Sequence, residues 1–369
     1  MIVIADDITG AAEIAGIAYA HGQKVRFVCN IPDSIENDGY DLLVVATDTR
    51  SMTEKEATIE TLRIIKHINS WDDKPLFKKT DSALRGHVVA ELSALLEHTG
   101  YQRVVYLPAN PSKGRIIDHG IYYIEQKDGG KLLRRRPLHE TDFSYDPEFP
   151  AKTSVLCERF PDAQRQHIVM PDATTLEEIR HIVNQYDKGK TLFAGAADLF
   201  KAVAGYNSAA PPQHVCHLAL DFPLLVVCGS TQSRPLDIGI TVAAMPLEIY
   251  DGANSEEWYV FLQRQYINDK RHSLILTIPP HRYNHDKETA LRLRHTMAEA
   301  VRRLCQCHLP RHLVIEGGAT AWSTLQALGW EQFDIVGNVA PGVVQMRAMC
   351  GTIVTLKPGS YDWGGLFGE

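Results

Sequence analysis

The stretch Pro75–Gly86, with the sequence PLFKKTDSALRG, joins an apolar run to a helical pattern that begins near His87. It places two lysines, an aspartate, two hydroxyl side chains and an arginine at one junction between a strand and a helix. In an open α/β sheet such junctions lie at the carboxyl edge, where ligands bind. A hydrophobic core requires none of these side chains, so their density predicts a site for an anionic, hydroxylated ligand. For this loop alone, the alternative is a solvated turn with a helix cap.

Three other loops of similar composition each follow an apolar run. Their sequences are ADDITGA at 5–11, TDTRS at 47–51 and PANPSKGR at 108–115. Each run has the character of a strand, and each loop is the polar segment that follows it. Four loops of this kind at the carboxyl ends of strands favour a functional site over a set of solvated turns.

The combination of ADDITGA, KKTDSALRGH and PANPSKGR resembles the four-carbon acid sugar kinase family. Shorter matches in the same order extend the resemblance over nearly the whole chain. They are Asp172-Ala173, AGAADL at 194–199, VCGST at 227–231, EGGAT at 316–320, Pro341-Gly342-Val343 and LKPG at 356–359. The resemblance implies an ATP-dependent kinase that phosphorylates threonate, erythronate or their 3-oxo derivatives.

Alternating strand and helix patterns predict an α/β fold with mostly parallel sheets. In the first half we expect strands near 2–5, 24–29, 41–46, 75–79 and 103–107, and helices at 10–21, 53–67 and 87–98. Asp128-Gly129-Gly130, between two strand-like runs, predicts a hairpin turn. In the second half we expect strands near 224–228, 245–250, 273–278, 312–316 and 353–357, and helices near 231–243, 255–266, 286–305 and 319–328.

A small, proline-containing and non-periodic segment between Asn207 and Pro223 is typical of an inter-domain linker. We therefore expect two α/β domains with a cleft between them. With the resemblance, residues 1–215 become a sugar-acid substrate-binding domain and residues 216–369 a nucleotide-binding domain.

Composition limits the partners. The chain has 369 residues, 44% of them hydrophobic and 22% charged, which is ordinary for a soluble globular enzyme. Its net charge of −7 argues against a nucleic-acid partner, and no apolar run approaches the roughly 20 residues of a membrane span.

Seven scattered cysteines and a first strand at the amino terminus favour a cytoplasmic protein. Cys305-Gln306-Cys307-His308 lacks a second ligand cluster, so we expect no protein-bound metal centre there.

The expected ligands are therefore a small-molecule sugar acid and ATP. A homodimer is compatible with the sequence. Arg85 and Arg115 are the best candidates to hold the acid, because a guanidinium group can bind a carboxylate through two hydrogen bonds. Arg50 is a third candidate, and Lys79 is expected to offset phosphate or carboxylate charge.

Asp6 and Asp7 are candidates to bind the sugar hydroxyls. Neighbouring side chains of an extended chain point to opposite sides, so we expect only one of them to face the ligand. We assign Asp7 as the base that accepts the proton of the attacking hydroxyl, and Asp81 is the alternative base. A helix cap is the competing role for Asp7.

The common phosphate-binding motif GxxxxGK[ST] is absent, so a nucleotide role must depend on glycine turns in the second half. The family resemblance implies nucleotide contacts from Ser230, Gly317, Gly318, Ala319, Thr320, Gly342 and Gly359, with ATP and Mg²⁺ as cofactors. The family usually has an acid where this chain has Ala319, which predicts weakened nucleotide or metal affinity. Glu316 could replace that acid, but its side chain should leave the strand in a different direction.

Three alternatives stay open at this stage. The protein could be a kinase for another short hydroxy acid, such as glycerate or a five-carbon acid. It could be a sugar-acid-binding homologue without catalysis, as Ala319 suggests. A dinucleotide-dependent oxidoreductase fits the α/β pattern but lacks GxGxxG after a first strand.

Overall fold

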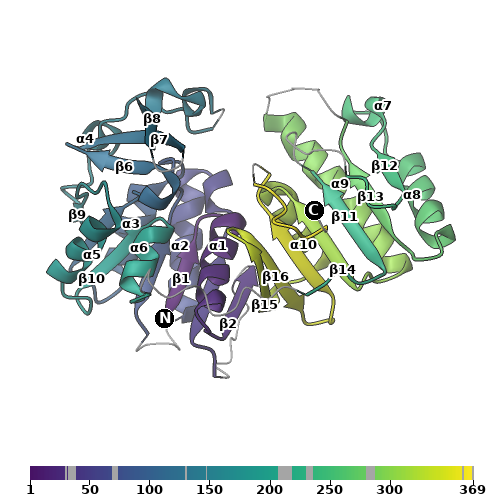
Figure 1. Ribbon diagram of the computed structural model, residues 1–369, viewed down its shortest axis with the longest axis horizontal. Coiled ribbons are helices and arrows are strands. Elements are labelled where there is room, and N and C mark those ends of the chain that lie inside the picture. The colour runs from purple at the N-terminus through teal and green to yellow at the C-terminus, as the bar shows by residue number, and fades with distance from the viewer. Residues whose placement is uncertain are drawn as a thin grey trace. The chain divides into compact units, whose positions relative to one another are not determined.

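The computed structural model describes residues 1–29, 31, 39–68, 74–128, 131–146, 148–206, 218–229, 236–279, 287–359 and 361–367. The chain divides into two compact units, drawn in Figure 1 and described separately below. The first unit consists of Met1–Ile14 and Ile31–Pro211, and the second of Ala15–Asn30 and Pro212–Glu369. Each combines helices with a mostly parallel sheet, which confirms the predicted α/β fold class. The predicted domain boundary at 215/216 lies outside the described residues.

The sheet of the first unit is parallel throughout. Its strand order is β3 (Leu42–Ala46), β1 (Ile2–Ala5), β4 (Leu76–Lys79), β10 (Thr191–Gly195), β5 (Arg103–Leu107) and β9 (Ile168–Val169). The helices are α1 (Ile8–Ala20, counted with the second unit from Ala15), α2 (Glu54–Ile68), α3 (Val88–Glu97), α4 (Leu156–Arg159), α5 (Leu176–Gln185) and α6 (Ala197–Val203). Every residue of β1, β3, β4 and β10 is buried, as is usual for parallel strands in α/β proteins.

A second, smaller antiparallel sheet belongs to the first unit and lies apart from the parallel sheet (Figure 1). It contains β6 (Arg115–Asp118), β7 (Ile121–Asp128) and β8 (Lys131–Pro137). The pairing of β7 with β8 confirms the predicted hairpin, and Gly129 and Gly130 of its turn lie outside the described residues. The Tyr122 hydroxyl donates a hydrogen bond to the carbonyl of Ser82, in the loop after β4. This contact places the small sheet at the carboxyl edge of the parallel sheet.

The second unit has a mixed sheet. Its order is β12 (Val242–Ala244), β13 (Leu274–Thr277), β11 (Leu224–Cys228), β14 (His312–Glu316), β17 (Ile353–Lys357), β16 (Val343–Ala348), β15 (Gln332–Ala340) and β2 (Val25–Cys29). The first five strands run parallel, and the last three pair antiparallel. The other elements are α7 (Leu247–Tyr250), α8 (Glu256–Asn268), α9 (Lys287–Cys307) and α10 (Gly318–Leu328). No described helix is long and apolar enough to cross a membrane.

Two predicted elements of the second unit are wrong. The predicted strand at 245–250 is instead the short helix α7, which Pro246 precedes as N-cap. The predicted helix at 231–243 ends in the strand β12, and Gly239 has a φ of +68°, which a helix does not allow. Residues 231–235 of that prediction lie outside the described residues. The predicted strand at 24–29 exists, but it pairs antiparallel with β15, because periodicity identifies a strand and not its partner.

Candidate active site

Arg50 is the centre of a charged cluster at the carboxyl edge of the first sheet. Its guanidinium group donates two hydrogen bonds to Asp6, at 3.0 and 3.3 Å. It also donates to Asp7 at 3.2 Å, and its Nη1 lies 3.7 Å from a carboxylate oxygen of Asp81. The three carboxylates follow β1 and β4, and Arg50 follows β3, so three neighbouring strands bring these four side chains together.

Asp6 and Asp7 do not point to opposite sides, contrary to the prediction. The chain bends at these two residues instead of continuing as a strand, so both carboxylates reach Arg50. They differ in exposure, since the Asp6 side chain is 2% exposed and that of Asp7 is 18% exposed. Asp7 is therefore the one more accessible to a ligand.

The two carboxyls also differ in pKa. Burial raises the pKa of Asp6 above its usual range. Burial acts in the same direction on Asp7, but Arg50, Lys79 and a hydrogen bond from Thr9 outweigh it and hold the pKa of Asp7 below its usual range. Asp7 also accepts a hydrogen bond from the backbone N–H of Gly10 at 2.9 Å. Asp7 thus caps the start of α1 and remains ionised at neutral pH.

Asp81 forms a two-bond ion pair with Arg85, with both N–O distances at 2.9 Å. Its carboxylate also accepts a hydrogen bond from the backbone of Ala83 at 2.9 Å. Arg85 donates a further hydrogen bond to Asp146 at 3.3 Å. The side chain of Asp81 is 10% exposed and that of Arg85 is 29% exposed.

Arg85 and Arg115 converge on the ring of Phe143. Their guanidinium carbons lie 5.7 and 5.3 Å from the centre of this ring. Phe143 belongs to the 3-10 helix η5 (Asp142–Tyr145), which follows the small sheet. Arg85 is already paired with Asp81 and Asp146, whereas Nη1 of Arg115 is buried without a hydrogen-bond partner among the described residues. Sequence reasoning missed Phe143 and Asp146, because the segment that carries them has no periodic pattern.

Lys79 is buried, with 4% exposure, so it is not a surface lysine. Its Nζ donates a hydrogen bond to the carbonyl of Thr80 at 3.0 Å and lies 3.7 Å from a carboxylate oxygen of Glu13. Glu13 also accepts a hydrogen bond from Lys113 at 2.6 Å. Glu13 was not among the predicted residues, and nothing in the pattern of α1 distinguishes it.

The loop that precedes Arg115 is held by Asp198 of α6. The Asp198 carboxylate accepts hydrogen bonds from the backbone N–H and the hydroxyl of Ser112, at 2.9 and 2.8 Å. Asp198 lies in the AGAADL match at 194–199, and its role was not predicted from the sequence.

Acidification should destabilise the protein through Asp81. Burial raises the pKa of this carboxyl, but Arg50 and Arg85 outweigh that effect and hold it below its usual range. A carboxyl with a lowered folded-state pKa stabilises the fold at neutral pH, and this stability is lost as the pH falls below the unfolded value of about 4. We expect the Tm of the wild type to fall more steeply between about pH 5 and pH 3 than that of Asp81→Asn. Parallel Tm curves for the two proteins would show that Asp81 does not carry this dependence.

In the second unit, the predicted glycine turns also meet. Gly317 is the N-cap of α10, with a φ of +99°, and its N–H bonds to the carbonyl of Lys357 at 2.9 Å. A Cβ added to Gly229 would lie 2.1 Å from the Thr320 hydroxyl, so the turn after β11 lies against the first turn of α10. Gly342 has a φ of +84° and lies beside Pro358, next to Gly359. Ser230 lies outside the described residues.

Glu316 and Lys357 form a buried ion pair beneath these turns. Their N–O distance is 2.5 Å, and each side chain is 3% exposed. Lys357 also donates to the carbonyls of Pro358 and Gly359, at 3.1 and 3.3 Å. Glu316 is thus committed to Lys357, and Ala319 itself is exposed in the first turn of α10.

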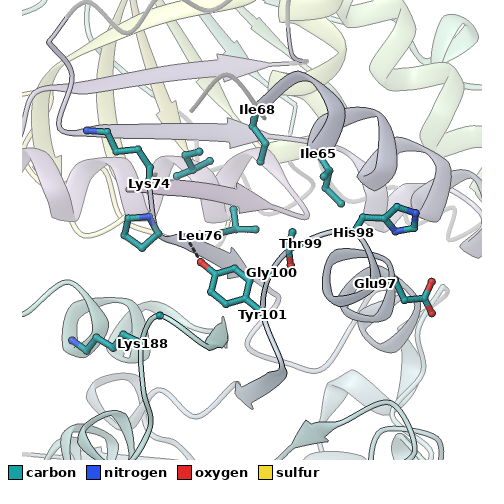
Figure 2. A pocket seen from close by; sticks show the side chains of 13 residues that line it. Ile65, Ile68, Lys74, Leu76, Glu97, His98, Thr99, Gly100, Tyr101 and Lys188 are labelled. Carbon is teal, nitrogen blue, oxygen red and sulfur yellow. Dashed lines mark hydrogen bonds between the residues drawn. The ribbon is translucent and has the colours of Figure 1, made fainter. Parts of the chain in front are cut away.

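A hollow of about 790 Å³ lies at the opposite end of the first unit's strands (Figure 2). It is lined near the starts of β1 and β4, where the Tyr101 hydroxyl accepts a hydrogen bond from the N–H of Leu76 at 2.9 Å. None of the predicted site residues lines it. We therefore assign the candidate site to the charged cluster at the carboxyl edge and not to this hollow.

Comparison with known proteins gives two family matches. A sugar-binding N-terminal domain matches residues 1–185, and a nucleotide-binding C-terminal domain matches residues 265–361. D-erythronate kinase of Heliobacterium modesticaldum is 29% identical over 48% of this chain and 39% of its own length. The 3-oxo-tetronate kinase of Brucella melitensis is 23% identical over 100% of this chain and 94% of its own length.

A solved structure from Salmonella typhimurium, described as a tRNA synthase, has the same fold. Its TM-score is 0.77 with 17% sequence identity, over 99% of this chain and 97% of that one. At this identity the likeness concerns the fold alone.

Proposed function

Because this chain belongs to the four-carbon acid sugar kinase family, we propose that it transfers the γ-phosphoryl group of ATP to a terminal hydroxyl of a four-carbon sugar acid. Threonate, erythronate and 3-oxo-tetronate are the candidate acids. The observation that carries the proposal is the convergence of Arg85 and Arg115 on Phe143, beside the cluster around Arg50.

The acid would bind through its carboxylate to Arg85 and Arg115. The carboxylate would give a hydrogen-bond partner to Nη1 of Arg115, which is buried without one among the described residues. Arg85 retains Asp81 as a fixed partner, which keeps the guanidinium plane oriented before the acid arrives. The sugar hydroxyls would contact the carboxylates that follow β1.

Asp7 would accept the proton of the attacking hydroxyl. Its carboxylate is ionised at neutral pH and more exposed than those of Asp6 and Asp81, so it combines acceptor capacity with access. As the hydroxyl oxygen attacks phosphorus and the bond to the ADP oxygen breaks, the hydroxyl proton moves to a carboxylate oxygen of Asp7. Lys79 lies close enough to Asp7 to lower its pKa and would offset charge near the transferring group.

ATP would bind at the glycine turns of the second unit. The N–H groups of the first turn of α10 are suited to phosphate oxygens, because the first N–H groups of a helix have no partner within it. Mg²⁺ bound to ATP supplies charge neutralisation for the phosphates. The Glu316 carboxylate is occupied by Lys357, so the phosphates themselves would provide most of the ligands to Mg²⁺.

We expect Ala319→Asp to tighten the binding of ATP with magnesium. Position 319 is exposed in the first helical turn, so an aspartate fits there without displacing a neighbour and is favoured by the helix dipole. Calorimetry with the wild type, Ala319→Asp and the uncharged control Ala319→Asn measures the effect. Equal affinity in the three proteins would show that the missing acid does not limit nucleotide binding.

A sugar-acid-binding protein without catalysis is the second candidate, and Ala319 together with the committed Glu316 favours it. Measurement of ADP release distinguishes these candidates. The assay contains ATP, magnesium and one acid from a panel of four-carbon acids, glycerate and five-carbon acids. The proposal expects the highest kcat/KM for a four-carbon acid. Preference for glycerate or a five-carbon acid would establish a different kinase, and acid binding without ADP release would establish the binding protein.

A further inference from the structure

We propose that a buried hydrogen-bond network centred on Glu91 positions Arg50 in the candidate site. Glu91 lies in α3 and is 1% exposed. Its Oε2 accepts hydrogen bonds from Lys78 Nζ at 2.5 Å and from Thr49 Oγ1 at 3.0 Å. The hydroxyl of Thr61, in α2, approaches the same oxygen at 3.5 Å. One carboxylate of α3 therefore contacts the strand β4, the 3-10 helix that begins at Thr49 and the helix α2.

The network continues to the first strand. The Thr49 hydroxyl lies 3.0 Å from that of Thr47, which donates a hydrogen bond to the carbonyl of Ala5 at 2.8 Å. Ala5 ends β1, Thr47 follows β3, and Lys78 is the second-to-last residue of β4. All of these residues are at most 2% exposed. The network thus fixes the carboxyl ends of three neighbouring strands to one another.

Three members of the network each directly precede a residue of the candidate site. The pairs are Ala5 with Asp6, Thr49 with Arg50, and Lys78 with Lys79. Neighbouring side chains of a strand point to opposite faces, so Lys78 can bind Glu91 while Lys79 faces Glu13. A displacement of the network would therefore move Asp6, Arg50 and Lys79.

Stability alone does not account for this arrangement. The side chains of Lys78 and Glu91 are 1% and 2% exposed, and removing two charges from water is costly. An apolar pair of similar volume is often at least as stable, so a buried ion pair is weak grounds for a purely stabilising role. An apolar pair could not bind the Thr49 hydroxyl. It would therefore not hold the start of η1 (Thr49–Ser51), which contains Arg50.

The test compares Thr49→Val with Thr49→Ser. Valine keeps the shape of threonine without the hydroxyl, and serine keeps the hydroxyl. Modification of Arg50 by phenylglyoxal, followed by peptide mass spectrometry, reports how often the guanidinium group leaves its carboxylates. We expect Arg50 of Thr49→Val to react about tenfold faster than in the wild type, and Thr49→Ser to restore most of the protection. Equal Arg50 reactivity in the valine and serine variants would overturn the proposal.

The kinetic consequence rests on the proposed kinase activity, whereas the reactivity of Arg50 does not. We expect Thr49→Val to lower kcat about tenfold, because misplacing a positioning group by a fraction of an ångström is costly, with the KM for ATP unchanged. If the wild type phosphorylates no acid, the proposed function fails, and the Arg50 reactivity still decides this inference. Normal kcat in Thr49→Val, together with an active wild type, would contradict the positioning role.

A second pair of variants tests the centre of the network. Glu91→Gln removes the charge that binds Lys78, and Glu97→Gln makes the same change at an exposed position of the same helix. We expect faster phenylglyoxal modification of Arg50 only in Glu91→Gln. The same reactivity in both variants would also overturn the proposal.

Discussion

Asp7→Asn should lower kcat by about 10²- to 10⁴-fold while the KM for the acid changes little, because a base acts only as the hydroxyl proton leaves. Asparagine is a good helix N-cap, so the cap on α1 should survive the substitution. Arg50 would keep Asp6 and Asp81 as partners. The expected loss is therefore one of chemistry, with a Tm close to that of the wild type.

Asp81→Asn is the matched control for this experiment. Asp81 is bound by Arg85 through two hydrogen bonds and by the Ala83 backbone, so its oxygens are committed to positioning the loop. We expect this variant to raise KM and lower Tm. If Asp81→Asn instead shows the large loss of kcat and Asp7→Asn does not, the two roles are exchanged.

Arg85→Ala should raise the KM for the acid by roughly 10²-fold or more, because a charged hydrogen-bonded pair with the carboxylate is lost. Since Asp81 loses its two-bond partner as well, we expect the free energy of unfolding to fall by about 1–3 kcal/mol. Steady-state kinetics and thermal unfolding measure the two effects separately.

Arg85→Lys distinguishes charge from geometry at the same position. Lysine keeps the positive charge but cannot form the two-bond pair, so we expect a KM between those of the wild type and Arg85→Ala. An unchanged KM in Arg85→Ala for every active acid would remove this loop from the acid site.

The position of the polar loops could be predicted because parallel strands bring their carboxyl ends to one edge. The loops after β1, β3 and β4 therefore had to meet, and Arg50 does lie among Asp6, Asp7 and Asp81. The contact of both Asp6 and Asp7 with Arg50 could not be predicted, because it depends on a bend in the chain that the strand pattern does not indicate.

Other parts of the site depend on long-range contacts that leave no local signal. Phe143 and Asp146 reach Arg85 from an irregular segment about 60 residues away in the sequence. Glu91 is an ordinary acid within a helical pattern, and only its burial beside Lys78 shows its importance.

The antiparallel strands β15 and β16 were missed although one signal was present. Residues of β15 alternate between buried and partly exposed positions, with Phe333, Ile335 and Val339 on the buried side. This period of two indicates a strand. The glycine at the turn between the strands, Gly342, was interpreted only as part of a nucleotide motif.

Transfer of labelled phosphate tests the central claim most directly. The protein is incubated with magnesium, ATP labelled in its γ-phosphate and each four-carbon acid, and the label is followed into phosphorylated acid and into inorganic phosphate. The proposed kinase predicts label in the phosphorylated acid, at a rate that Asp7→Asn lowers by about 10²-fold or more. Label only in inorganic phosphate, or no transfer to any acid while the protein still binds one, would contradict it.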